Sequence, residues 1–271
     1  MVKDYPINLI KAEKYLIDLI KEAGKLLEKY FHAENLGKKP KGEHDLVTEA
    51  DLAVDELVIK KLKKEFPRIP ILTEETSDGN FDRYKKTDFF WLVDPLDGTT
   101  NFSRGLPHFA IAIALVFGNQ PILGAVYNPL YRNLYWARKD GEGAFLNGRQ
   151  ITLSKETELQ KTVVCLDWSH ALALRNKTLI LTGKLLGKVG HIKMMGSAAT
   201  DIVHVACGKI DAYLHANCFP WDYAASVIIA RKAGAKVTDI SGKKWDVFTP
   251  GILVASSVIH QKLLKLSNLS S

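Results

Sequence analysis

Hydrophobic residues recur with helical spacing near the start of the chain. Over residues 7–31 the apolar positions are Leu9, Ala12, Leu16, Leu19, Ile20, Ala23, Leu26, Leu27 and Tyr30. This spacing predicts a long amphipathic helix that covers one face of a sheet. A second helix is predicted farther along, with an apolar face formed by Val47, Ala50, Val54, Leu57, Val58 and Leu62. Thr48 can cap this helix, with Asp51 three residues later. The polar stretch from Lys38 to Asp45 is predicted to be a loop.

The middle of the chain carries apolar runs with the length of strands. Phe89 to Val93 are all aromatic or aliphatic, which predicts a strand buried on both faces and flanked by helices. Pro95 is expected to end it, because proline donates no hydrogen bond to a central ladder. Three later runs predict an antiparallel meander, and a hairpin turn continues it: 109–117, 122–127, 134–137 and the turn 141–148.

The last third alternates helices and strands. We expect helices over 198–207, from Asp222 to about 233, and at the end of the chain, with strands over 212–215, 236–240 and 252–255. Such alternation is typical of an α/β fold built from layers of sheets and helices. The chain is expected to form two tightly joined halves, 1–155 and 156–271, which together can count as one domain.

Candidate chemistry concentrates after the 89–93 strand. The run Trp91 to Phe102 reads WLVDPLDGTTNF, so Asp94 and Asp97 lie at the strand's carboxyl end, followed by Gly98 and two threonines that suit a helix start. Open α/β sheets bind ligands at this end of their strands. Two carboxylates with backbone amides close behind predict a metal and phosphate site. An ordinary turn is the competing interpretation, because Asp, Pro and Gly favour turns.

Three other acidic clusters accompany this run. Glu74 and Glu75 follow the short apolar stretch 69–72, Asp51 lies in the first turn of the second helix, and Asp222 begins a later helix. Each has a structural explanation as well, since exposed Glu pairs are common and acids favour helix starts. Asp51 and Asp55 lie four residues apart and repel one another unless a cation is near.

In order and spacing, these four clusters resemble the inositol monophosphatase family of magnesium-dependent, lithium-sensitive sugar phosphatases. That family includes archaeal-type fructose-1,6-bisphosphatases and nucleotide 3'-phosphatases. The resemblance rests on DPLDGTTNF at 94–102, on Trp221-Asp222 with Ala224-Ala225, and on Glu74-Glu75. It spans nearly the whole chain. It implies an αβαβα sandwich with the active site between the two halves, the first half carrying the main metal and phosphate motif, and commonly a homodimer.

The resemblance also implies a metal centre with two or three Mg²⁺. Glu74, Asp94 and the Leu96 carbonyl would hold one ion, and Asp94, Asp97 and Asp222 a second. Glu74 would help to hold a third, with Asp51 acting through water. Oxygen ligands of this kind suit Mg²⁺.

Catalytic and substrate roles follow by the same resemblance. Thr99, paired with Asp51, would orient the attacking water, while the amides of Gly98 and Thr99 receive phosphate oxygens. Asp222 would steer the water that protonates the leaving alcohol. The segment Gly196, Ser197, Ala198 and Ala199 would line the sugar pocket, with Ser169 nearby.

One position departs from the family pattern. Inositol-selective members carry a glutamate seven residues before the second-motif aspartate, where this chain has His215. His215 either bonds the substrate's hydroxyls or is a rim residue. Arg175, Lys177, Lys184 and Lys188 lie near the expected mouth and suit a second phosphate. We therefore expect a phosphatase for a small sugar or polyol phosphate. Inositol 1-phosphate comes first, fructose 1,6-bisphosphate is the alternative or a second substrate, and nucleotide 3'-phosphates follow.

Composition changes this picture little. A net charge of +7, from 37 Lys and Arg against 30 Asp and Glu, raises the alternative of a basic, non-enzymatic nucleic-acid binder. No zinc-finger spacing or aromatic RNA motif accompanies the charge, so nucleic acid is not an expected partner. A membrane is not expected either, because the apolar run 109–117 is too short for a membrane helix. Three cysteines without metal-ligand spacing predict free thiols in a reducing compartment, and no signal-peptide pattern is present. We expect a cytoplasmic protein.

Overall fold

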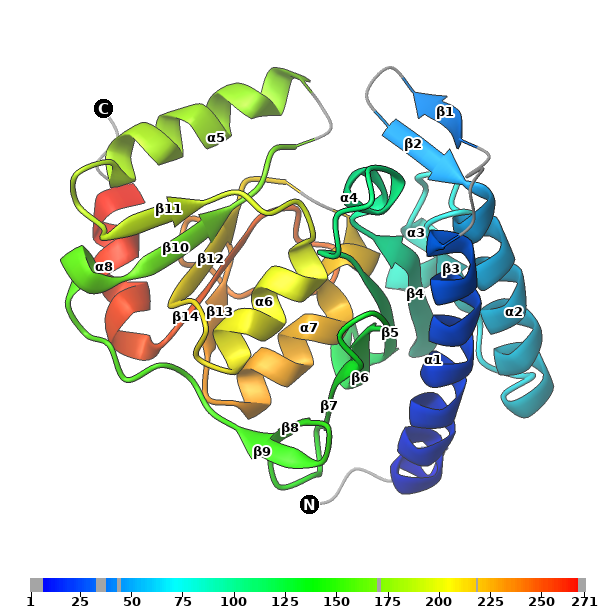
Figure 1. The fold of residues 1–271 in the computed structure, drawn as a ribbon. Coiled ribbons are helices and arrows are strands. Elements are labelled where there is room, and N and C mark those ends of the chain that lie inside the picture. Colours follow the sequence, from blue (N-terminus) through cyan, green and yellow to red (C-terminus); the bar gives the residue numbers. More distant parts are fainter. Residues whose placement is uncertain (1–6, 33–37, 43–44, 170–171, 218, 268–271) are drawn as a thin grey trace.

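The protein is a five-layer αβαβα sandwich (Figure 1). The computed structural model describes residues 7–32, 38–42, 45–169, 172–217 and 219–267. A seven-stranded sheet and a five-stranded sheet form the two β layers. The predicted fold class is therefore confirmed.

The seven-stranded sheet has the order β3-β4-β5-β6-β7-β8-β9. Its strands are β3 (Ile71–Thr73), β4 (Phe89–Asp97), β5 (Ala110–Phe117), β6 (Gln120–Asn128), β7 (Asn133–Arg138), β8 (Ala144–Leu146) and β9 (Arg149–Ile151). Only the β3–β4 pair is parallel. The run from β5 to β9 is the predicted antiparallel meander.

The five-stranded sheet has the order β11-β10-β12-β14-β13. Its strands are β10 (Val163–Leu166), β11 (His191–Lys193), β12 (Ala212–His215), β13 (Lys236–Thr238) and β14 (Ile252–Ala255). The chain passes from one sheet to the other between residues 151 and 163, through the short 3-10 helix η1 (Leu159–Lys161). A division into halves at 155 and 156 agrees with this change of sheet and stays a prediction.

Three helical layers bury the sheet faces. Helices α1 (Leu9–Phe31) and α2 (Glu49–Glu65) pack on one face of the large sheet, around Trp91 and Val93 of β4. Helices α6 (Ala198–Ala206) and α7 (Pro220–Lys232) fill the space between the sheets, and α5 (Leu172–Leu185) and α8 (Ser257–Ser267) cover the outer face of the small one. Helix α7 approaches β6 so closely that a Cβ on Gly124 would lie 2.6 Å from the Ala225 carbonyl oxygen.

Two predictions about the backbone were wrong. Residues 38–45 are not a plain loop, because β1 (Lys38–Gly42) and β2 (Asp45–Thr48) pair antiparallel. Strand β4 does not end at Pro95 but continues to Asp97 through a β-bulge between Asp94 and Asp97. The proline lies inside this bulge, where the missing N–H costs no ladder bond. Two short helices complete the fold, α3 (Asp82–Lys85) and α4 (Thr99–Ser103).

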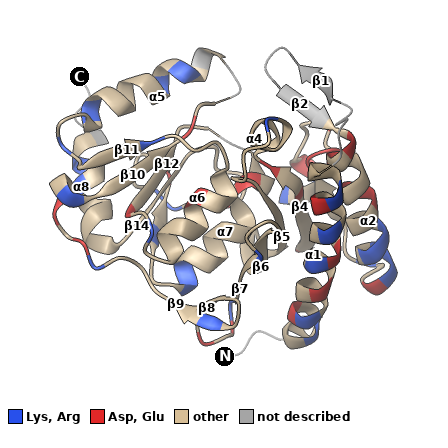
Figure 2. Ribbon diagram, viewed as in Figure 1, with Lys and Arg blue, Asp and Glu red and all other residues tan. Residues whose placement is uncertain are grey.

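Charged side chains are mixed on the outer helices. Figure 2 shows Lys and Arg interspersed with Asp and Glu along α1 and α2. Such mixing is typical of solvated helix faces. Among the described residues, no helix is both long and apolar enough to cross a membrane.

Candidate active site

The bulge at the end of β4 leads directly into helix α4. Gly98 begins this helix with φ +90°, in the left-handed region that favours glycine. A Cβ at this position would also lie 3.0 Å from the His108 carbonyl oxygen. Glycine therefore allows the turn to place Asp94, Asp97 and Thr99 close together.

These residues line a cavity of about 470 Å³ to which both halves of the chain contribute. Its lining residues are Glu74, Asp94, Leu96, Asp97, Gly98, Thr99, Thr100, Asn101, Asp167, Trp168, Ser169, Arg175, Met194, Met195, Gly196, Ala198, His215 and Asp222. The lining thus includes three of the four acidic clusters predicted from sequence, and the fourth reaches it through the contact between Asp51 and the lining residue Thr99. The volume is in the range that small-molecule sites use.

Buried carboxylates give this cavity its chemical character. Asp94 is 1% exposed, and burial together with the charges of Glu74, Asp97 and Asp222 raises its pKa well above the ordinary value. Burial also raises the pKa of Asp97 to about 7, although hydrogen bonds from Ser197 and Ala199 oppose the change. Carboxylates packed this closely favour either protonation or a bound cation.

The residues present fit magnesium. Glu74, Asp94, Asp97 and Asp222 offer carboxylate oxygens, and the backbone carbonyl of Leu96 lies on the same wall. A donor set made only of oxygen is the one that Mg²⁺ prefers. Asp222 also serves as a helix-start residue, because its Oδ2 accepts a hydrogen bond from the Phe219 N–H at 2.8 Å.

Thr99 contacts Asp51, as predicted. The Thr99 hydroxyl lies 3.2 Å from Asp51 Oδ1 and 3.0 Å from the Leu96 carbonyl oxygen. Asp51 is held by the predicted capping box, in which the Thr48 N–H donates to its Oδ2 at 2.9 Å. Burial raises the pKa of Asp51 to about 6. The nearby charge of Glu75 contributes to that rise.

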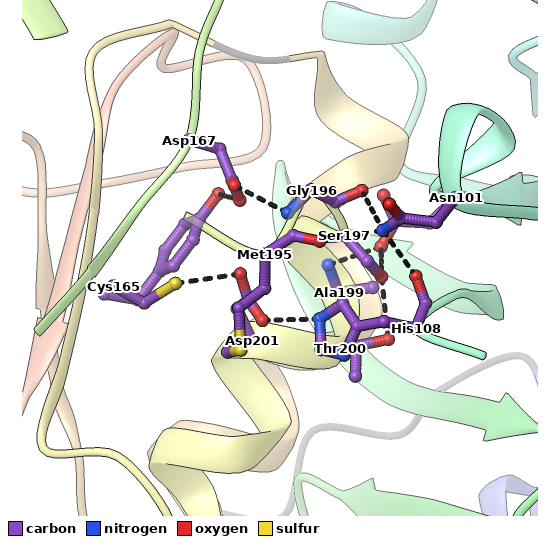
Figure 3. A network of polar contacts seen from close by, with 12 residues as sticks. Asn101, His108, Cys165, Asp167, Met195, Gly196, Ser197, Ala199, Thr200 and Asp201 are labelled. Atoms are coloured by element: carbon purple, nitrogen blue, oxygen red, sulfur yellow. Dashed lines mark hydrogen bonds and ion pairs between the residues drawn. The ribbon is translucent and has the colours of Figure 1, made fainter. Parts of the chain in front are cut away.

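Helix α6 holds Asp97 from the other half of the chain (Figure 3). The Ala199 N–H donates to Asp97 Oδ2 at 2.8 Å, and the Ser197 hydroxyl donates to the same oxygen. Gly196 and Ala198 line the cavity as predicted, whereas the Ser197 side chain is 1% exposed and is used by Asp97 and Thr200.

Sequence reasoning assigned no role to Asn101, which joins the two halves, or to Asp167, which holds Gly196 and Tyr213 within the second half. Asn101 Nδ2 donates to the carbonyl oxygens of Met195 at 2.7 Å and of His108 at 2.8 Å. Asp167 accepts from the Gly196 N–H at 2.8 Å and from the Tyr213 hydroxyl at 3.1 Å. Asn101 lies within the 94–102 motif, which was the available signal. Asp167 had no local signal, because its partners are distant in sequence.

His215 is part of the cavity wall. Its side chain is 2% exposed, and Nδ1 lies 2.9 Å from the Tyr223 hydroxyl. His215 is therefore a buried wall residue rather than an exposed one, and whether it contacts a substrate stays a prediction. Ser169 and Arg175 also line the cavity, and Arg175 Nε donates to the Ser169 carbonyl oxygen at 3.0 Å. Lys177, Lys184 and Lys188 are not among the lining residues, which favours the alternative that they are solvated helix charges, and a role for them at the mouth stays a prediction.

Fold and cavity together define the class of protein: an α/β enzyme whose acidic, oxygen-only site suits a metal-assisted reaction of a phosphate ester. A family model described as the inositol monophosphatase family matches residues 9–270. The chain therefore belongs to the inositol monophosphatase family. It is a phosphoric monoester hydrolase, and the family is in general magnesium-dependent.

Individual relatives agree with this assignment. Inositol monophosphatase 1 of Solanum lycopersicum is 35% identical over 259 residues, covering 94% of this chain and 93% of the relative. The fructose-1,6-bisphosphatase/inositol-1-monophosphatase of Thermotoga maritima is 32% identical, with 94% of each chain covered. The crystal structure of extragenic suppressor protein suhB from Bartonella henselae has a TM-score of 0.87 at 31% identity, covering 96% of this chain and 100% of that one.

Proposed function

We propose that this phosphatase hydrolyses the phosphate monoester of a small sugar or polyol, with inositol 1-phosphate as its preferred substrate. The observation that carries the proposal is the cavity of about 470 Å³, which combines the carboxylates of Glu74, Asp94, Asp97 and Asp222 with the turn at Gly98 and Thr99. A cavity of this size accommodates one monosaccharide or polyol with its phosphate.

The proposed metal ligands are Glu74, Asp94, the Leu96 carbonyl, Asp97 and Asp222, holding two or three Mg²⁺. When bound, the ions supply positive charge that activates water and stabilises the leaving oxygen of an in-line displacement. Burial and repulsion from neighbouring carboxylates raise the pKa values of Asp94 and Asp97, and a bound cation would offset both effects.

The remaining roles belong to the chain's own groups. The Thr99 hydroxyl, 3.2 Å from Asp51 Oδ1, orients the attacking water. Asp51 accepts the proton that this water loses. Glu74, which also lines the cavity, assists the activation of this water. The N–H groups of Gly98 and Thr99 bind the phosphate oxygens, and Asp222 directs the water that protonates the leaving alcohol. Gly196, Ala198 and His215 contact the sugar, while Ser197 acts through Asp97.

Fructose 1,6-bisphosphate is the second candidate substrate. Arg175 lines the cavity, and its Nε donates to the Ser169 carbonyl oxygen. The two terminal nitrogens of its guanidinium group are suited to bind a second phosphate. The name of the Thermotoga relative includes both activities. Nucleotide 3'-phosphates form a third option, and a nucleic-acid partner is not proposed.

The test compares phosphate release from the three substrate classes at equal Mg²⁺, with Li⁺ added in a parallel series. We expect inositol 1-phosphate to have the highest kcat/KM and Li⁺ to inhibit. Arg175→Gln should lower kcat/KM for fructose 1,6-bisphosphate about tenfold and leave inositol 1-phosphate nearly unchanged. Equal losses on both substrates would contradict a role in binding the second phosphate, and no release from any of them would contradict the proposed function.

A homodimer and a cytoplasmic location are also proposed. Helix α5 and the turn after it expose several large apolar side chains: Leu172, Leu179, Ile180 and Leu186, which are 55, 60, 59 and 73% exposed. Exposed apolar groups of this kind often mark a protein interface. Light scattering should give twice the chain mass, and a monomer at micromolar concentration would contradict the dimer. Cys165 and Cys207 are free thiols as predicted, and Cys218 lies outside the described residues.

A further inference from the structure

A second group of potential metal ligands lies beside the cavity just described. The ligand atoms of His108, Asp201 and His204 all lie within 4.8 Å of one another. His108 Nε2 and Asp201 Oδ1 are 2.8 Å apart, and the two imidazole rings have centroids 5.7 Å apart. Figure 3 shows His108 approaching Asp201 from the large-sheet side. These three residues are absent from the lining of the acidic cavity.

The spacing of these residues in the sequence is one that metal ligands use. Asp201 and His204 lie three residues apart in α6, a spacing that places both side chains on one face of a helix. The same carboxylate-x-x-His spacing supplies metal ligands in helical bundles. His108 lies two residues before β5 and so adds a ligand from a different layer of the fold.

The two imidazoles are in the protonation state that metal binding needs, whereas burial raises the pKa of Asp201 to about 7, so a bound cation would favour its ionised form. Burial lowers the pKa of His204 to about 3 and also lowers the pKa of His108, so both rings are neutral at pH 7 with a lone pair to donate. Asp201 is fully buried, and its second oxygen, Oδ2, accepts from the Cys165 thiol at 3.1 Å. That contact fixes Oδ1 toward the two histidines.

Space for a fourth ligand is present. A separate cavity of about 20 Å³ is lined by both His108 and His204, together with Thr200, Val203 and Tyr135. This volume holds about one water molecule. Two imidazoles, one carboxylate and one water form the set with which proteins bind zinc tetrahedrally.

We propose that His108, Asp201 and His204 bind one Zn²⁺ ion, with a water molecule from the small cavity as the fourth ligand. Ligand atoms about 2.05 Å from a tetrahedral zinc lie about 3.3 Å from one another. His108 and Asp201 therefore need to move apart by about half an ångström, and His204 needs to approach them. Nitrogen ligands distinguish this site from the oxygen-only magnesium centre.

The consequence is a clamp between the two halves of the chain. The ion would join the start of β5 to α6, the helix whose Ala199 N–H holds Asp97. His108 also presents its carbonyl to Asn101 Nδ2, so the same residue faces the active-site turn. We expect zinc to stabilise the fold without being needed for turnover.

The experiment uses the whole protein with Mg²⁺ in excess to fill the acidic site, and Co²⁺ as a spectroscopic substitute for zinc. Wild type should bind one Co²⁺ per chain with visible absorption bands of a four-coordinate ion, and Zn²⁺ should displace it. Zn²⁺ should also raise the Tm by several degrees. His204→Phe keeps an aromatic ring but removes the nitrogen, so it should lose the bands and the Tm rise.

Three controls keep the result interpretable. His191→Ala removes an exposed histidine outside the cluster and should behave as wild type. His204→Ala repeats the test if the Phe variant does not fold. Magnesium-dependent phosphate release by the His204 variants should stay within about twofold of wild type. Unchanged Co²⁺ binding in either folded His204 variant, or no bound Co²⁺ in wild type, would overturn the proposal.

Discussion

Removing Mg²⁺ should make the stability of this protein depend steeply on pH. Metal-free, the structure buries several carboxylates whose pKa values are raised, among them Asp97 at about 7 and Asp51 at about 6, against an ordinary value of 3.8. The folded protein then binds more protons than the unfolded chain between these values. The contribution of these carboxyl groups to the free energy of unfolding is fully present below about pH 4 and is lost as the pH rises through their folded pKa values.

The size of the effect follows from the two pKa values. One pKa unit corresponds to about 1.4 kcal/mol. Between about pH 5 and about pH 8, Asp97 should therefore remove about 3 kcal/mol from the free energy of unfolding, and Asp51 about 1 kcal/mol. Saturating Mg²⁺ should abolish most of this slope, because the cation stabilises the ionised carboxylates and binds only the folded state.

Urea unfolding at several pH values, in EDTA and in Mg²⁺, measures this slope. Asp97→Asn removes one titrating group and should flatten the metal-free slope by about 3 kcal/mol over the same range. Asp18→Asn, at an exposed position of α1, is the matched control and should leave the slope unchanged. A metal-free free energy of unfolding that stays constant or rises from pH 5 to pH 8 would refute the reasoning.

Three further predictions concern single positions. Thr99→Val should lower kcat about a hundredfold with a small change in KM, because the variant cannot orient water; steady-state kinetics that give a wild-type kcat would exclude that role. Gly124→Ala should reduce the free energy of unfolding by about 2 kcal/mol, since its Cβ would lie 2.6 Å from the Ala225 carbonyl oxygen and from Ile228 Cγ2; equal urea midpoints would contradict the close packing of α7 on β6. His215→Glu should raise the kcat/KM ratio of inositol 1-phosphate over fructose 1,6-bisphosphate about tenfold, and an unchanged ratio would show that this wall position does not contact the sugar.

The parts of the fold that were predictable depend on local pattern. The helical spacing in 7–31 and the apolar run 89–93 led directly to α1 and β4, and the capping box of Thr48 and Asp51 formed as expected. The continuation of β4 past Pro95 was not predictable from the proline alone, because a bulge relieves the missing hydrogen bond. Polar composition likewise hid the β1–β2 pair.

For the site as well, residues fixed by local sequence were predictable and residues that depend on distant contacts were not. Residues within the 94–102 run were identifiable because their spacing is fixed by one strand end and one turn. Asp167 depends on Gly196 and Tyr213, which lie 29 and 46 residues away, and the cluster of His108, Asp201 and His204 depends on a contact that spans 93 residues and two layers of the fold. One interpretation placed His215 on the rim, because its position at the end of a short strand does not show that Tyr223 of α7 packs against it.

The central claim is that the carboxylates of the large cavity hold Mg²⁺ for phosphate-ester hydrolysis. The most direct test measures phosphate release from inositol 1-phosphate by wild type and by Asp222→Asn, each with and without Mg²⁺, after circular dichroism has shown that both are folded. We expect Mg²⁺-dependent release by wild type and a loss of about a hundredfold or more in the variant. Equal release by the two folded proteins, or release by wild type that does not depend on Mg²⁺, would contradict it.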